Sequence, residues 1–497
     1  MSDFKIVEDE DSLLGILVRG CDERIFLREK SNANKYHLNP VEYANLLQRG
    51  SCTCNLLTPD GHKVADAFLE SYNQKTYQDI VINQMSRIQS VLSLNIDNNK
   101  IADFDVVFGP SGSDMMYIPL LFKSMMEGKD CKIVNIITCP DELGSGSVPA
   151  GELKYYAKYN QMGEDIPIAE YIENTGATIE AVHIAARESE EGIITDRKPE
   201  LREILNKYKN TTDEKGVVVN LVYASKSGII DDLSIIDEYL EESISNKFTF
   251  VVDMCQFRVD MEIVHSLLKK NVSVMITTSK FFQAPPFCGA LLVPSLLLEK
   301  ISSLDAAFCA PAYYRIFSSY DFPPKLTNIG QHLTPYENKG LRVRWEVGLC
   351  EMEAYLAYPP AMRDEYIARW KSIIIGRLAQ SNTFEIMPNV DDTVPTILSF
   401  KVKRVDGSSL SKPELQALFD NLALNEQQGL RDGYTKVFIG QPVAFGKKAF
   451  IRLAIGSANL RQQFESKNYD AHNDIRVIDI IENLAKTMYP ETDFSKL

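Results

Sequence analysis

From Asp103 onward, short apolar runs rich in β-branched residues alternate with longer segments of helical spacing. Nearly continuous apolar runs are typical of strands that are buried on both faces of a parallel sheet. Their alternation with helices predicts a three-layer α/β domain with a mostly parallel sheet. The runs comprise residues 106–108, 133–137, 179–184, 217–222, 248–252, 274–277 and 290–293.

The pattern is different on both sides of this region. The first hundred residues are predicted to be mostly helical, with one helix over 41–47 after Pro40 and helical spacing over 65–98. After about Thr327, a long helical pattern at 338–358 precedes a mixture of strands and helices, which predicts a smaller α+β domain. Strands are expected at 394–402 and 449–455, and helices at 412–422 and 475–487.

The length of 497 residues exceeds one simple core, since domains usually have about 100–200 residues. We therefore expect an N-terminal, mostly helical segment over 1–100, a large α/β domain over 101–330, and a small α+β domain over 331–497.

Charge and cysteine content narrow the class of protein. The net charge of −15, from 53 basic and 68 acidic residues, argues against nucleic-acid and anionic-membrane partners. No apolar stretch reaches the about 20 residues of a membrane-spanning helix, and the polar amino terminus lacks a signal-peptide pattern, so a cytoplasmic protein is expected. The nine cysteines are expected to be reduced thiols. Cys52 and Cys54 are the only close pair, and no second Cys/His pair accompanies them, so no metal site is predicted.

Three polar features follow apolar strands. Lys280 comes after the run at 274–277, and burial lowers the pKa of a lysine amine, which favours attack on carbonyls and Schiff-base formation. Asp253 directly follows the run at 248–252. The sequence Pro-Ser-Gly-Ser-Asp at 110–114 is a small-residue turn that opens a helix, as in phosphate-binding sites.

Each feature also has an ordinary explanation. Lys280 can reach solvent from a strand end, Asp253 can be a turn or cap residue, and Ser113 can simply cap a helix. Their shared position favours a joint site, because α/β sheets bind ligands beyond the carboxyl ends of their strands. Together they form the amine, the acid and the phosphate turn that pyridoxal 5'-phosphate requires.

These motifs resemble fold-type I pyridoxal-phosphate-dependent enzymes, and are most similar to the class V aminotransferase and cysteine desulfurase branch. The resemblance implies a homodimer that acts on an amino acid or amine. It implies that Asp253 contacts the ring nitrogen, Gln256 the ring hydroxyl, and catalytic Lys280 the cofactor aldehyde. The phosphate would be held by the turn of Ser111, Gly112 and Ser113, and by a hydroxyl just before the lysine, which is Thr278 or Ser279.

The resemblance extends to the small domain, but one expected feature, the residue that stacks on the cofactor ring, is missing. Related enzymes place an arginine in a strand of the small domain to bind the substrate α-carboxylate, and Arg452 occupies such a position. They usually stack an aromatic residue or histidine on the ring, but residues 138–147 contain neither. Glu142 is the nearest occupant, and this Gly/Ser-rich loop either shapes the substrate pocket or is a surface loop.

The motifs predict a carbanion at the substrate α-carbon but leave its fate open. An aminotransferase is the first interpretation. The alternative is a lyase that eliminates or replaces a β or γ substituent, or a desulfurase, for which Cys309 and Cys350 are the only later cysteines. A third interpretation is a catalytically inactive scaffold with this fold, which the missing ring-stacking residue would fit.

Overall fold

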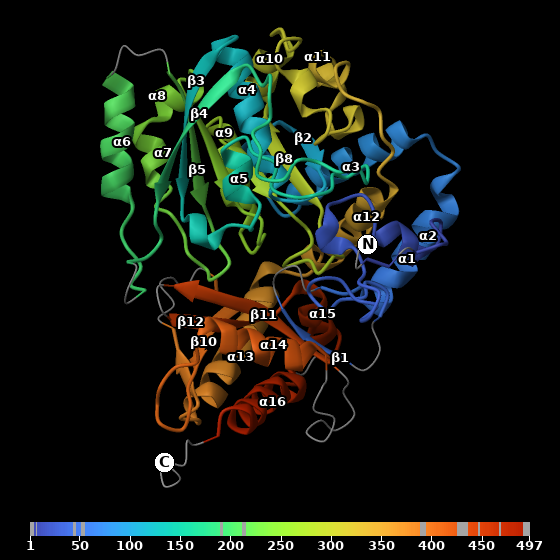
Figure 1. Cartoon of the computed structure of the whole chain (residues 1–497), viewed down its shortest axis with the longest axis vertical. Coiled ribbons are helices and arrows are strands. Elements are labelled where there is room, and N and C mark those ends of the chain that lie inside the picture. The colour runs from blue at the N-terminus through green and yellow to red at the C-terminus, as the bar shows by residue number, and fades with distance from the viewer. Residues whose placement is uncertain are drawn as a thin grey trace.

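The computed structural model describes residues 4–5, 7–42, 46–50, 55–188, 192–210, 215–387, 394–424, 436–445, 448–466 and 469–490. Two sheets organise these residues (Figure 1). A seven-stranded sheet lies in the upper part of that view, and a five-stranded sheet lies below it with the C-terminal helices.

The larger sheet has the order β2-β8-β7-β6-β5-β3-β4. All of its strand pairs are parallel except the two that involve β8, which confirms the predicted three-layer, mostly parallel α/β domain. All seven predicted apolar runs form strands here. The strands are β2 (Phe104–Gly109), β3 (Cys131–Thr138), β4 (Ala177–Ile184), β5 (Lys215–Val222), β6 (Phe248–Asp253), β7 (Ser273–Ile276) and β8 (Gly289–Pro294).

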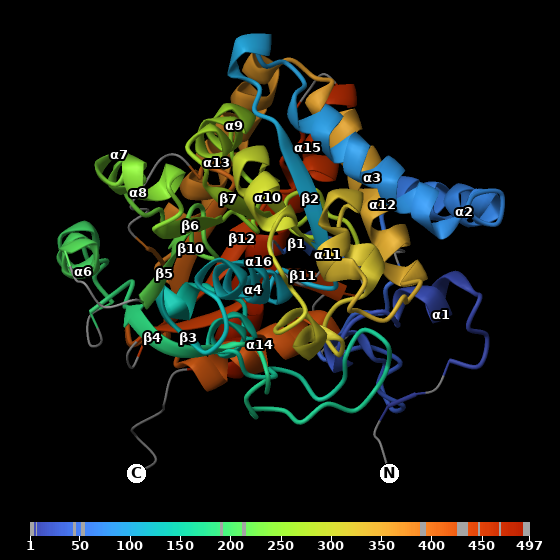
Figure 2. The same ribbon diagram turned by 90° about the horizontal axis from the view of Figure 1, so that it is seen from above.

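Helices cover both faces of this sheet. Along β2, Val106 and Phe108 enter one hydrophobic core and Val107 enters another, because successive side chains of a strand point to opposite faces. Seen from above, α9 and α4 lie on opposite sides of the sheet (Figure 2). One face is covered by α3 (Tyr77–Leu92), α9 (Met261–Lys269) and α12 (Lys339–Leu356), and the other by α4 (Tyr117–Glu127), α5 (Ser147–Gly151) and α10 (Ser295–Ser302). Shorter or peripheral helices are α6 (Lys198–Asn210), α7 (Ser234–Glu238), α8 (Leu240–Ile244) and α11 (Thr327–Gly330).

The smaller sheet has the order β1-β11-β12-β10-β9 and confirms the predicted C-terminal α+β region. Its strands are β1 (Leu46–Arg49), β9 (Phe384–Ile386), β10 (Ile397–Val402), β11 (Lys436–Phe445) and β12 (Lys448–Ala454). The accompanying helices are α13 (Pro360–Ala379), α14 (Lys412–Leu424), α15 (Ser457–Ser466) and α16 (His472–Met488).

The N-terminal segment departs from its predicted helical character. The helix predicted over 41–47 is wrong for Leu46 and Leu47, which lie in β1 and pair in parallel with β11. The free edge of β11 provides hydrogen-bond partners that a local helix pattern does not reveal. The remaining helices are α1 (Leu13–Leu17), α2 (Pro59–Tyr72) and α3, and the Thr76 hydroxyl caps α3 and divides the helical pattern over 65–98. β1 therefore links this segment to the small sheet, while the three domain boundaries stay predictions.

No helix in the described ranges combines the length and apolar character needed to cross a membrane. The seven described cysteines are free thiols. Cys52 and Cys54 lie outside the described residues, so the absence of a metal site there stays a prediction.

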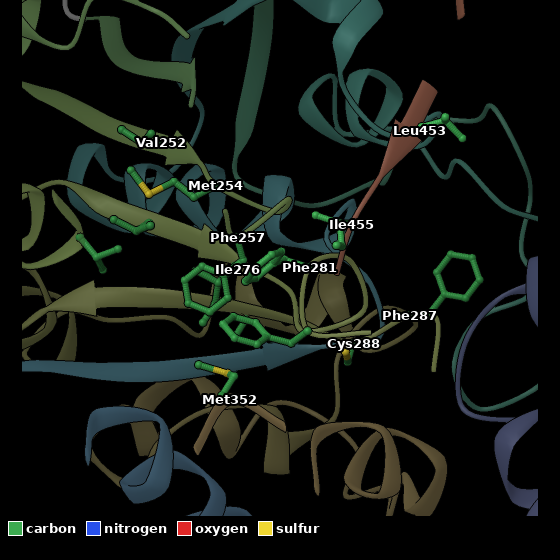
Figure 3. Close-up of a cluster of buried hydrophobic side chains, with 14 of the residues drawn as sticks. Val252, Met254, Phe257, Ile276, Phe281, Phe287, Cys288, Met352, Leu453 and Ile455 are labelled. Atoms are coloured by element: carbon green, nitrogen blue, oxygen red, sulfur yellow. The ribbon is translucent and has the colours of Figure 1, made fainter. Parts of the chain in front are cut away.

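The residues after Lys280 anchor the loop that carries this lysine in the core. Phe281 and Phe282 are buried, and both rings lie against Tyr355 of α12, with centroids 5.1 and 6.0 Å apart. Phe257 packs on Phe282 at 5.4 Å. Figure 3 shows Phe257 and Phe281 beside Ile276 at the end of β7, with Met352 of α12 below. This aromatic cluster holds the lysine at the edge of the core.

Truncation of Phe282 should therefore destabilise the whole fold. For Phe282→Ala we expect the free energy of unfolding to fall by about 3–5 kcal/mol, because a large buried ring leaves a cavity. Urea titrations followed by circular dichroism measure this change. The control is Leu296→Ala, whose side chain is 50% exposed, for which we expect a change within about 0.5 kcal/mol. Equal losses in both variants would contradict the anchoring role.

Candidate active site

A cavity of about 400 Å³ opens at the carboxyl ends of the central strands, within the size range of ligand pockets. Residues that follow β2, β5, β6 and β7 line it, together with β12 of the small sheet and parts of the N-terminal segment. The structure brings most of the predicted site residues together here. On its walls lie Ser111, Gly112, Ser113, Asp253, Gln256, Ser279, Lys280 and Arg452.

Thr278 is the predicted site residue that does not line this cavity. Its side chain is fully buried, with Oγ1 3.1 Å from Sγ of Cys288. On its other side lies Gly348 of α12, where a Cβ would come within 2.1 Å of Thr278 Oγ1. Of the two hydroxyls considered for the phosphate, Ser279 is therefore the one that faces the cavity.

Lys280 is half-buried, four residues beyond the end of β7. Its loop is held by a residue from the N-terminal segment. The Asn55 side-chain amide donates to the carbonyl oxygens of Ser279 and Lys280, at 2.7 and 3.0 Å. Gln48 Nε2 in turn donates to Asn55 Oδ1 at 2.6 Å. The backbone that carries the amine is thus fixed by contacts from more than 220 positions earlier in the chain.

Asp253 ends β6 and faces the same cavity. Burial raises the pKa of its carboxyl, while the positive charges of Lys280 and Lys226 act in the opposite direction. Oδ1 accepts a hydrogen bond from the backbone N–H of Cys255 at 2.8 Å. A carboxylate has several acceptor positions, so Asp253 can accept a further hydrogen bond from a donor group of a ligand.

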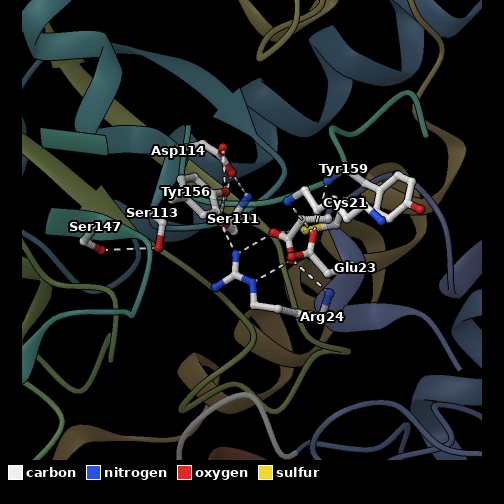
Figure 4. A network of polar contacts seen from close by, with 12 residues as sticks. Cys21, Glu23, Arg24, Ser111, Ser113, Asp114, Ser147, Tyr156 and Tyr159 are labelled. Carbon is white, nitrogen blue, oxygen red and sulfur yellow. Dashed lines mark hydrogen bonds and ion pairs between the residues drawn. The ribbon is translucent and has the colours of Figure 1, made fainter. Parts of the chain in front are cut away.

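The turn after β2 is held in shape by a buried acid (Figure 4). The backbone N–H and the hydroxyl of Ser111 both donate to Asp114 Oδ2 at 2.8 Å, and the Tyr156 hydroxyl donates to Oδ1 at 2.8 Å. Burial raises the pKa of Asp114 to about 7. At Gly112, a Cβ would lie 2.8 Å from Cys255 Sγ, so glycine allows this turn to approach the end of β6.

Arg24 is a cavity residue that the sequence interpretation did not include. Its Nε and Nη2 donate to both carboxylate oxygens of Asp22, at 2.7 and 2.6 Å, and Nη2 also lies 3.3 Å from Ser111 Oγ. The guanidinium stacks over Phe287 at 4.5 Å from the ring centroid. This contact with the turn spans 87 positions and no local motif accompanies it, so Arg24 could not be predicted from the sequence.

Glu142 was the nearest candidate to stack on the cofactor ring, but its carboxylate is engaged in hydrogen bonds with residues of other loops. Oε1 accepts from Arg187 Nη1 and the Ser227 hydroxyl, at 2.5 and 2.8 Å. Oε2 accepts from the Ser225 hydroxyl and the Ser227 N–H, at 2.7 and 2.9 Å. Glu142 therefore joins the loop after β3 to the loop after β5. The Gly/Ser-rich loop lines the cavity through residues 141–145 and Ser147.

Arg452 lies in β12 and is 1% exposed. Nη1 donates to the carbonyl of Lys226 at 2.7 Å, and Nη2 donates to the carbonyl of Gln441 at 3.1 Å. Its Nε is buried without a hydrogen-bond partner, and Arg452 forms no ion pair with any of the described acidic residues. A buried guanidinium that faces a cavity without a carboxylate is suited to bind an anionic ligand.

Comparisons with family models and with curated protein sequences found no match. Solved structures match the fold at low sequence identity. The 4-hydroxyphenylacetaldehyde synthase of Rhodiola rosea has a TM-score of 0.53 at 13% identity, over 93% of this chain and 86% of that one. TDC of Oryza sativa, solved with PLP and tryptamine, gives 0.52 at 12% identity, over 90% and 84%. A NifS-like protein of Rickettsia africae gives 0.51 at 11% identity, over 88% and 99%. The chain therefore has the fold of fold-type I pyridoxal-phosphate-dependent enzymes.

Proposed function

We propose that this protein is a pyridoxal-phosphate-dependent aminotransferase that acts at the α-carbon of an amino acid. The observation that carries the proposal is the position of Lys280, Asp253 and the turn at 111–113 on the walls of one cavity at the strand ends. An amine, a half-buried acid and a small-residue turn in one cavity fit the three parts of this cofactor.

The site suits each part of the cofactor. Asp253 has acceptor capacity for a protonated ring nitrogen, whose positive charge would stabilise a carboxylate that burial disfavours. Gln256 accepts from Arg258 Nε through Oε1 at 3.4 Å, which leaves its amide N–H groups for the ring hydroxyl. Gly112, Ser113 and Ser279 would hold the phosphate. The bound cofactor supplies an electron sink for negative charge at the substrate α-carbon.

Lys280 would act twice. Its Nζ would bind the cofactor aldehyde covalently, and after displacement by the substrate amine it would remove the proton from the α-carbon. The backbone contacts from Asn55 and the buried rings of Phe281 and Phe282 keep this amine at the cavity wall. Such fixed positioning favours proton transfer at one carbon.

Arg452 favours transamination over decarboxylation. A guanidinium that binds both oxygens of the α-carboxylate stabilises its negative charge, and this charge must leave the carboxylate when CO₂ is lost. The TDC of Oryza sativa, by contrast, was solved with tryptamine, an amine that has no carboxylate. A buried Arg452 without an acidic partner therefore supports a reaction in which the substrate keeps its carboxylate.

Elimination or replacement by a lyase remains the alternative, since it also keeps the carboxylate. A desulfurase would require a reactive thiolate. Burial raises the pKa of Cys309 to about 12, and burial also raises the pKa of Cys350 and of the cavity residue Cys255. These three cysteines are therefore poor nucleophiles. An inactive scaffold is the third possibility, and the homodimer implied by the sequence resemblance is part of the proposal.

The first test is covalent binding of the cofactor. Purified protein incubated with pyridoxal phosphate should become yellow and retain the colour through gel filtration, because Lys280 binds the aldehyde. Lys280→Ala should lose the retained absorbance, whereas the matched control Lys132→Ala, at the other end of β3, should keep it. Mass spectrometry after borohydride reduction should place the cofactor on Lys280. Wild-type protein that stays colourless would support the scaffold interpretation.

The second test separates the reactions. With an amino-acid donor and a keto-acid acceptor, an aminotransferase forms a new amino acid and a new keto acid without release of CO₂, ammonia or sulfide. We expect Arg452→Gln to raise the substrate KM at least about tenfold, because it loses a charged hydrogen-bond pair to the carboxylate. Chromatography of the products and a CO₂ assay provide the measurement. Stoichiometric CO₂, or ammonia without a new amino acid, would contradict transamination.

A further inference from the structure

The cavity contains more positive charge than the proposed cofactor site uses. Among the residues that the structure describes, five basic side chains line it, and only some of them are compensated by acids. Arg24 is paired with Asp22 through two hydrogen bonds, and Lys280 would be consumed by the aldehyde. Lys412 is exposed to solvent. This leaves Lys226 and Arg452, neither of which forms an ion pair with an acid of the described chain.

Lys226 lies in the turn after β5 and is fixed from both sides. Its carbonyl oxygen accepts a hydrogen bond from Arg452 Nη1 at 2.7 Å, and its Nζ lies 3.4 Å from the carbonyl oxygen of Asp141. The residues next to it, Ser225 and Ser227, are held by the carboxylate of Glu142. The ammonium group is therefore confined to the cavity wall beside Arg452.

The acids near Lys226 are occupied by other partners. The Glu142 carboxylate accepts from Arg187 and from the loop serines, and Asp141 pairs with Arg187 at 3.2 Å. Burial lowers the pKa of Lys226 to about 8. The charge of Glu142 opposes this, while Arg452 and Lys280 add to it. Two cations held side by side in this environment stabilise an anion that bridges them.

Lys226 and the phosphate turn are contacted by different residues. Lys226 Nζ lies 3.4 Å from the carbonyl oxygen of Asp141, and its backbone carbonyl accepts from Arg452 Nη1. The phosphate turn is contacted instead by Arg24, whose Nη2 lies 3.3 Å from Ser111 Oγ and which is paired with Asp22. The cofactor phosphate, placed at the turn of residues 111–113, thus leaves Lys226 available.

We infer that Lys226 binds a second anionic group of the substrate, so that the enzyme acts on acidic amino acids. This inference rests on the proposed function, in which Arg452 binds the α-carboxylate. The planar guanidinium already matches both oxygens of one carboxylate. The ammonium of Lys226 is then the partner of a carboxylate at the end of the substrate side chain.

The test compares each acid with its uncharged amide. Dissociation constants are measured by calorimetry at pH 7 for two pairs of ligands, L-aspartate with L-asparagine and L-glutamate with L-glutamine. Each measurement is made with protein saturated with pyridoxal phosphate and with the same protein without added cofactor. We expect wild-type protein to bind at least one acid about tenfold more tightly than its amide. Lys226→Met should abolish this preference and Lys226→Arg should retain it. Lys132→Met, which makes the same change of charge elsewhere, should leave it intact.

The preference should also depend on pH. Since the free amine of Lys226 loses its proton near pH 8, the preference for acid over amide should be largest at pH 7 and below and should shrink above pH 8. The charged groups facing it are Glu142, Asp141, Arg452 and Lys280. In Lys226→Arg the preference should persist to higher pH, because a guanidinium stays protonated.

Three results would overturn the inference. The first is equal binding of both acids and their amides by wild-type protein. The second is a preference for the acid that survives Lys226→Met. The third is weaker cofactor binding in Lys226→Met at an unchanged preference, which would assign Lys226 to the cofactor. If the cofactor never binds Lys280 but a Lys226-dependent preference is present, the proposed function fails and the anion site stands. If the cofactor binds without any preference, the inference fails and the proposed function stands.

Discussion

The hydrogen bonds from Asn55 to the carbonyls of Ser279 and Lys280 are the constraint on which the site depends. They fix the backbone of the proposed catalytic amine from the N-terminal segment. The small sheet adds a second hold, since the N–H of Ser457 after β12 donates to the carbonyl of Phe281 at 2.8 Å. A long, flexible lysine side chain gains precision only if its backbone is rigid. The loop that carries Lys280 therefore depends on the whole fold, because the N-terminal segment, α12 and the residues after β12 all contact it.

Charge is divided between the two ends of the cavity. At the phosphate turn, the guanidinium of Arg24 is compensated by Asp22, and Asp114, whose pKa burial raises to about 7, is mostly protonated below that pH. A neutral acid there does not repel a phosphate. Lys226 and Arg452, by contrast, form no ion pair with the acids that the structure describes. The proposed cofactor end is thus balanced by the protein itself, whereas the proposed substrate end would be balanced by an anionic ligand.

The sequence predicted the parts of the fold that local patterns encode. Apolar runs predicted all seven strands of the large sheet, and two polar residues chosen because they follow such runs, Asp253 and Lys280, lie on the walls of one cavity. Local patterns failed where a distant partner decides the structure. Leu46 and Leu47 form a strand because β11, about 390 positions later, offers a free edge. Arg24 and Lys226 were missed for the same reason, since their importance comes from contacts with Ser111 and Arg452.

In the proposed function, the residues that would select the substrate are physically separate from those that would hold the cofactor. Asp253, Lys280 and the turn at 111–113 follow strands of the large sheet, so the rigid sheet sets their spacing. Arg452 comes from the small sheet and reaches across to the carbonyl of Lys226 in the loop after β5. That hydrogen bond joins the small sheet to the large one and places two cations together that form no ion pair within the described residues. Under the proposed function, a change at Lys226 or Arg452 would alter which amino acid binds, while the residues at the strand ends would still determine at which carbon the reaction occurs.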